Sequence, residues 1–96
     1  MKIPKSIKLR SRVIITKFIK DLYEIRELKG EADFDTNTIL LATDKKLPIT
    51  VKEIAYCHEW LHLALTQNGF DDISSNEKFV EIMSECIHEL IMQVGK

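Results

Sequence analysis

The chain has 96 residues, of which 45% are hydrophobic and 30% charged, with three glycines and two prolines. This length accommodates one hydrophobic core and this composition is typical of a globular protein, so disorder and low complexity are excluded and a single domain spanning residues 1–96 is expected. The net charge is −1, but residues 1–30 hold nine Lys or Arg against three acids, whereas residues 31–96 hold five against twelve. Residues 1–30 are therefore basic, and the rest of the chain is acidic.

No apolar run approaches the roughly 18 residues that a membrane span requires, and the basic N-terminus lacks the apolar stretch and cleavage site of a secretory signal. Cys57 and Cys86 are too few for a disulfide framework, and each is expected to be a small core side chain with a free thiol. A cytoplasmic location without membrane association is predicted.

The first half of the chain has the pattern of a sheet. Apolar and polar residues alternate over residues 6–19, which predicts a strand that a turn at residues 10–12 divides into a hairpin. Residues 20–29 are mixed and polar, and a loop that could include a helical turn is expected there. A short strand at residues 32–34 and a buried strand at residues 38–42 follow. Together they predict a small, mainly antiparallel sheet.

A helix follows the sheet. Thr50 and Glu53 have the spacing of a capping box, in which the two side chains satisfy backbone donors at a helix start. The helix is expected to end near Gln67, because Asn68 and Gly69 can adopt the left-handed conformation that terminates helices.

A second capping box, Ser74 to Glu77, predicts another helix. Its apolar residues keep helical spacing, so most of them are expected in the core, whereas His88 is expected at the surface. The apolar positions are Phe79, Ile82, Met83, Cys86, Ile87, Leu90 and Ile91. The expected fold is α+β, with a small sheet followed by two helices.

The first helix contains the sequence HEWLH, residues 58–62. His58 and His62 are four residues apart, so both imidazoles project from one face and can bind one tetrahedral zinc ion. Glu59 lies beside the metal, where it can take a proton from the bound water. This pattern predicts a Zn²⁺ site with Glu59 as the catalytic base. Trp60 is expected to pack in the core, and Cys57 points away from the histidine face.

A catalytic zinc ion needs a third protein ligand. If the two helices are antiparallel and joined by a short loop, residue 60 faces about residue 82. Glu81 is then the nearest carboxylate and the preferred ligand, with Glu85 about one turn further. Glu77 is displaced by more than a turn.

HEWLH, followed on a second helix by Glu81-Ile82-Met83-Ser84-Glu85, resembles the ImmA/IrrE-type metallopeptidases, especially small phage-encoded relatives. The resemblance covers most of the chain. It implies a minimal zincin-like domain of the gluzincin type, in which two histidines and a downstream glutamate bind zinc. Carried over residue by residue, it implies metal ligands His58, His62 and Glu81, with Glu59 catalytic. If a phage carries the gene, the location is the cytoplasm of the host cell.

The expected function is therefore zinc-dependent hydrolysis of peptide bonds in a peptide or protein substrate, which an exposed sheet edge at residues 38–42 could bind. One alternative is a zincin-fold binding or regulatory module with weak or no catalysis. A less favoured alternative is a regulator that contacts nucleic acid through its basic N-terminal residues. These are Lys2, Lys5, Lys8, Arg10, Arg12, Lys17 and Lys20. The sequence assigns no oligomeric state.

Overall fold

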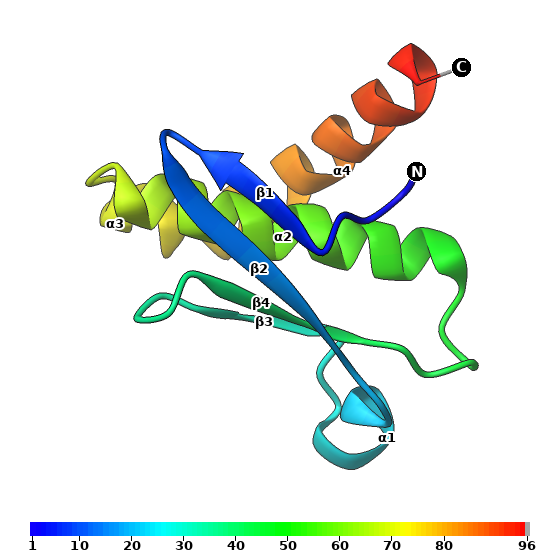
Figure 1. Ribbon diagram of the computed structural model, residues 1–96. Coiled ribbons are helices and arrows are strands. Elements are labelled where there is room, and N and C mark those ends of the chain that lie inside the picture. The colour runs from blue at the N-terminus through cyan, green and yellow to red at the C-terminus, as the bar shows by residue number, and fades with distance from the viewer. Residues whose placement is uncertain (96) are drawn as a thin grey trace.

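The structure is a computed structural model that describes residues 1–95. It has an α+β fold, as predicted, with a mixed four-stranded sheet and four helices (Figure 1). In chain order the elements are β1 (Ser6–Leu9), β2 (Arg12–Ile19), α1 (Leu22–Arg26), β3 (Gly30–Asp33), β4 (Thr38–Ala42), α2 (Ile49–Gln67), α3 (Asp71–Ser74) and α4 (Glu77–Val94).

The N-terminal hairpin forms as predicted. β1 and β2 pair antiparallel, and the turn between them places Arg10 and Ser11 at φ of 48° and 73°. Two consecutive left-handed residues are the signature of a type I′ turn, whose twist matches that of the strands it joins. The alternating pattern of residues 6–19 therefore encodes this part of the sheet locally.

The strand order is β1-β2-β4-β3, with β2 and β4 parallel and the other two pairings antiparallel. β4 therefore lies inside the sheet, and the expectation that residues 38–42 form an exposed edge is wrong. The edges are β1 and β3. After β2 the chain forms α1 and then β3, which becomes an edge of the sheet, and it returns as β4 between β2 and β3. The side chains of β4 are mostly buried.

Helix α2 lies between the sheet and α4 (Figure 1) and packs against β3 and β4 on one side and α4 on the other. Its Leu63 joins Ile14 of β2 and Ile39 and Leu41 of β4 in the core, and each of these side chains is at most 1% exposed. Trp60 packs against the same cluster, as expected. Because α2 is buried between two layers, its histidine face has a fixed position relative to both.

The predicted capping box at Thr50 is wrong. α2 begins at Ile49 after Pro48, without a side-chain cap, and Thr50 is exposed within the helix. Glu53 instead turns into the interior, where the Nε2 atom of His88 donates a hydrogen bond of 2.7 Å to it. His88 is therefore buried, contrary to expectation, because a buried carboxylate requires a polar partner from the facing helix.

The start of the last helix also differs from the prediction. Ser74 belongs to the short helix α3, and Asn76 caps α4 by accepting a 3.1 Å hydrogen bond from the backbone N–H of Phe79. Ser74 is therefore not a cap, and its buried hydroxyl is available for another role.

The apolar stripe of α4 is mostly exposed rather than in the core: Ile82 is 49% and Leu90 60% exposed. Helix α4 instead packs on α2 through a narrow face that contains Val80, Ser84 and His88. Since α4 is the outermost layer, it has one neighbouring layer to bury residues against. Cys86 lies on the exposed side, so the expectation that it is a core residue is wrong, whereas Cys57 is buried as expected.

None of the helices formed by residues 1–95 combines the length and hydrophobicity needed to cross a membrane.

The buried carboxylate of Glu53 predicts an acid-sensitive contribution to stability. Burial raises its pKa, but the hydrogen bond from His88 and the Met1 ammonium group, 3.4 Å away, more than offset this, so its pKa lies below the ordinary 4.5. The contribution is therefore present above about pH 4.5 and is lost as the pH falls through the lower, folded-state pKa.

Urea unfolding between about pH 6 and pH 3 checks this expectation. The free energy of unfolding should fall more steeply with acidification in the wild type than in Glu53→Gln. Parallel profiles for the two proteins would show that Glu53 has the same pKa in the folded and unfolded chains.

Candidate metal centre

His58 and His62 lie on one face of α2 with their Nε2 atoms 3.2 Å apart. Two nitrogen ligands of a tetrahedral zinc ion, each at about 2.0–2.1 Å from the metal, are about 3.3 Å apart. Their side chains are 27% and 13% exposed, so a molecule in solution can reach the pair. The geometry of the two histidines therefore fits one metal ion between them.

Glu77, the first residue of α4, completes this group. Its two carboxylate oxygens lie 3.8 Å from Nε2 of His58 and 3.7 Å from Nε2 of His62. The side chain is 71% exposed, so it is free to move the few tenths of an ångström that a ligand position requires. His58, His62 and Glu77 form a group that could hold a metal ion, with ligand atoms within 4.8 Å of one another.

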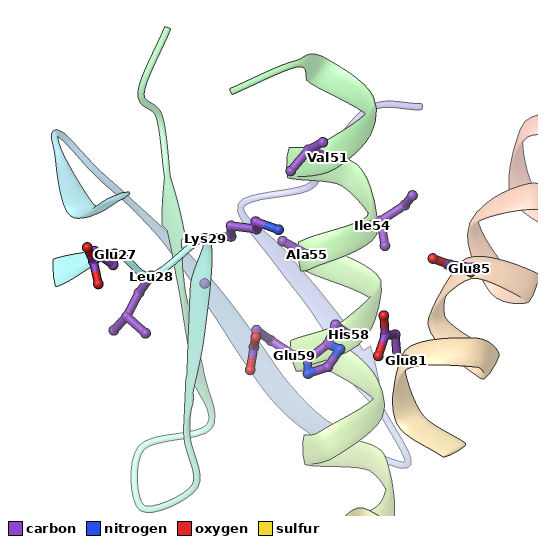
Figure 2. A pocket seen from close by; sticks show the side chains of 11 residues that line it. Glu27, Leu28, Lys29, Val51, Ile54, Ala55, His58, Glu59, Glu81 and Glu85 are labelled. Atoms are coloured by element: carbon purple, nitrogen blue, oxygen red, sulfur yellow. The ribbon is translucent and has the colours of Figure 1, made fainter. Parts of the chain in front are cut away.

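Glu81 lies one turn further along α4 and is not part of this group of three. It lines the adjacent cavity together with His58 and Glu85 (Figure 2). The prediction of Glu81 assumed that a simple loop joins the two long helices, but α3 lies in that connection and contacts α2. The start of α4 is thereby placed beside the histidines, which favours Glu77 as the third ligand.

Ser74 orients His62. Its hydroxyl oxygen lies 2.9 Å from Nδ1 of His62 and accepts a 3.2 Å hydrogen bond from the hydroxyl of Thr66. If Ser74 also accepts the proton of Nδ1, the lone pair of Nε2 is left free to face the metal group. The sequence predicted that Ser74 caps the last helix. Its contact with His62 depends on the position of α3, which the spacing of residues along the chain does not reveal.

The surroundings of His62 also favour its neutral form. Burial lowers its pKa, and neighbouring His58 lowers it further, against an opposing effect of Glu77. A histidine that binds a metal must be a neutral imidazole, so the lowered pKa makes His62 compatible with a ligand role at neutral pH.

We expect Ser74→Ala to weaken zinc binding by about 10- to 100-fold, because loss of a hydrogen-bond partner leaves the imidazole free to rotate and to change tautomer. Competition with a chromophoric chelator measures this affinity. The matched control is Ser75→Ala, whose exposed hydroxyl bonds the backbone carbonyl of Asp72. Equal zinc affinities in the two variants would contradict the role of Ser74.

Glu59 projects from α2 toward β3 (Figure 2). A Cβ atom at Gly30 would lie 3.2 Å from its Cγ atom, so glycine at this position leaves room for the glutamate. Burial raises the pKa of Glu59 to about 7, with further contributions from Glu77 and Glu31. A carboxylate with a pKa near neutrality is suited to exchange protons as a general acid and base.

A cavity of about 410 Å³ adjoins Glu59 and His58. It lies between α2, α4 and the segment that leads from α1 into β3 (Figure 2). The remaining lining residues are Glu27, Leu28, Lys29, Gly30, Val51, Ile54, Ala55, Glu81 and Glu85. The cavity therefore gives a molecule of side-chain or peptide size access to Glu59.

Two nearby side chains lie outside the candidate metal-binding group of His58, His62 and Glu77. Burial raises the pKa of Cys57 to about 11, so its thiol is neutral in the core and is a poor ligand. His88 is hydrogen-bonded to Glu53 and lies outside the group of three.

No family model, curated protein or solved structure matches this chain. The likeness to the ImmA/IrrE-type metallopeptidases therefore depends on the sequence motifs quoted above, and the case for a function depends on the site itself.

Proposed function

We propose that this protein is a zinc-dependent peptidase with a zincin-like arrangement of helix and sheet. The observation that carries the proposal is the 3.2 Å separation of the His58 and His62 Nε2 atoms, with the Glu77 carboxylate within 4 Å of both. Two imidazoles and one carboxylate are the ligand set of many catalytic zinc sites, which keep the fourth position for water or substrate.

A divalent cation held by these three residues would polarise the scissile carbonyl and lower the pKa of the attacking water. Glu59 accepts a proton from that water and delivers it to the amine that leaves. In the metal-free protein, burial raises the pKa of Glu59 above the ordinary carboxylate value, which supports its uptake of a proton from that water.

The edge strand β3 supplies a place for the peptide. Because β3 pairs with β4 on one side, its other edge offers backbone donors and acceptors to an extended chain. Gly30, the first residue of β3, lies against Glu59 and lines the cavity. A substrate added to this edge would pass beside the catalytic base.

Mass spectrometry of a peptide mixture incubated with the zinc-loaded protein tests the proposal. We expect cleavage products that disappear when a chelator removes the metal and return when zinc is restored. Absence of products from correctly folded, zinc-loaded protein would reject the peptidase function.

A second candidate is a binding module that retains the fold without turnover. The exposed apolar stripe of α4 favours it, since large exposed apolar patches commonly mark sites of protein interaction. The same cleavage assay separates the two candidates, because a binding module releases no products.

A further inference from the structure

The rim of the cavity beside Glu59 is mostly acidic. Glu27, Glu81 and Glu85 contribute exposed carboxylates, and Lys29 is the one cationic residue in the lining. Within residues 1–95, these three glutamates form no salt bridge. The three carboxylates outnumber the one lysine, so the cavity carries an excess of negative charge that attracts a cation.

The inner wall of the same cavity is apolar. Leu28, Val51 and Ile54 are half-buried lining residues, and Ala55 is buried. An apolar wall below a charged rim suits an amphipathic side chain, whose methylene stem contacts the wall while its charged end stays near the carboxylates. Lysine and arginine have this construction.

The cavity also adjoins the proposed reaction centre, since His58 and Glu59 line it. Its volume of about 410 Å³ lies in the range of protein pockets that hold small ligands or side chains. A side chain that enters it therefore belongs to a residue next to the bond that Glu59 would help to break.

We propose that this cavity is a specificity pocket for a lysine or arginine side chain that flanks the scissile bond. The inference rests on the proposed peptidase function, from which it takes a peptide as the ligand. It adds which class of peptide is preferred, a property that the group of His58, His62 and Glu77 does not define.

Binding of three matched peptides to the metal-free protein tests the pocket without turnover. The peptides differ at one position, which carries lysine, norleucine or glutamate, so that norleucine keeps the stem and removes the charge. We expect the lysine peptide to bind about three- to tenfold more tightly than the norleucine peptide, as fits a few exposed charge pairs. Adding salt should reduce this ratio. Equal or undetectable binding of the three peptides would overturn the inference.

A charge reversal at the rim tests whether this cavity causes the preference for lysine. In Glu85→Lys the preference should shift from the lysine peptide toward the glutamate peptide, because one attractive carboxylate becomes a cation. The matched control is Glu89→Lys, which makes the same change one turn further along α4, outside the cavity lining. An equal shift in both variants would show that overall charge, and not this pocket, selects the ligand.

Cleavage assays with the zinc-loaded protein separate this inference from the proposed function. Equal cleavage rates for the three peptides would reject the pocket and retain the peptidase. Selective binding of the lysine peptide without cleavage of any peptide would reject the peptidase and retain the pocket.

Discussion

Replacing Glu59 by glutamine is expected to lower kcat/KM for peptide hydrolysis by about 100- to 10,000-fold, the usual contribution of a general base. Zinc binding should persist, because Glu59 is not part of the group of His58, His62 and Glu77. Glutamine keeps the size of the side chain beside Gly30 but cannot take up the proton. Initial rates and bound zinc per chain, measured on the same preparation, check both halves of the expectation.

The matched control for this variant is Glu89→Gln, which makes the same change at an exposed position on α4. Its rate should equal that of the wild type. If Glu59→Gln retained full activity with zinc bound, another group would have to act as the base and the assignment of Glu59 would be wrong.

Replacing Glu77 by alanine is expected to weaken zinc binding by about 100-fold or more, since even the outer partners of metal ligands contribute 10- to 100-fold. Glu81→Ala should retain nearly the affinity of the wild type, because Glu81 lies outside the group of three. Competition with a chromophoric chelator measures the affinities. Zinc should also raise the melting temperature of Glu81→Ala more than that of Glu77→Ala at the same concentration.

Glu85→Ala serves as the control for this pair, since it removes a carboxylate from the same helix and the same cavity as Glu81. Loss of zinc binding in Glu81→Ala but not in Glu77→Ala would restore the ligand that the sequence suggested. Equal binding by all three variants would show that the histidines hold the metal without a glutamate from α4.

The sequence by itself determined those features that depend on near neighbours in the chain. The alternation of residues 6–19 predicted the strands of the hairpin, and residues 38–42 were predicted as the strand that the structure contains. Asn68 and Gly69 marked the end of α2, where Gly69 has a φ of 84°. The pairing of His58 with His62 also follows from spacing alone, because residues four apart share one face of any α-helix.

The tertiary structure alone decided which distant residues meet. The short helix α3 and the contact of Val80 and Ser84 with α2 set the register that places Glu77 beside the histidines. Spacing within one helix cannot reveal that register, because it depends on how two helices pack. Glu53 was predicted to be part of a cap because its actual partner, His88, lies 35 residues further along the chain, where local spacing does not reveal it.

Burial was the other property that the sequence could not determine. A helical stripe of apolar residues shows that a helix has an apolar face, but not whether another element covers that face. Helix α4 is the outermost layer, so its larger stripe is exposed while a smaller face packs on α2. The sequence thus determined the histidine pair and its helix, whereas packing decided which glutamate lies beside the pair and formed the cavity that His58 shares with Glu59.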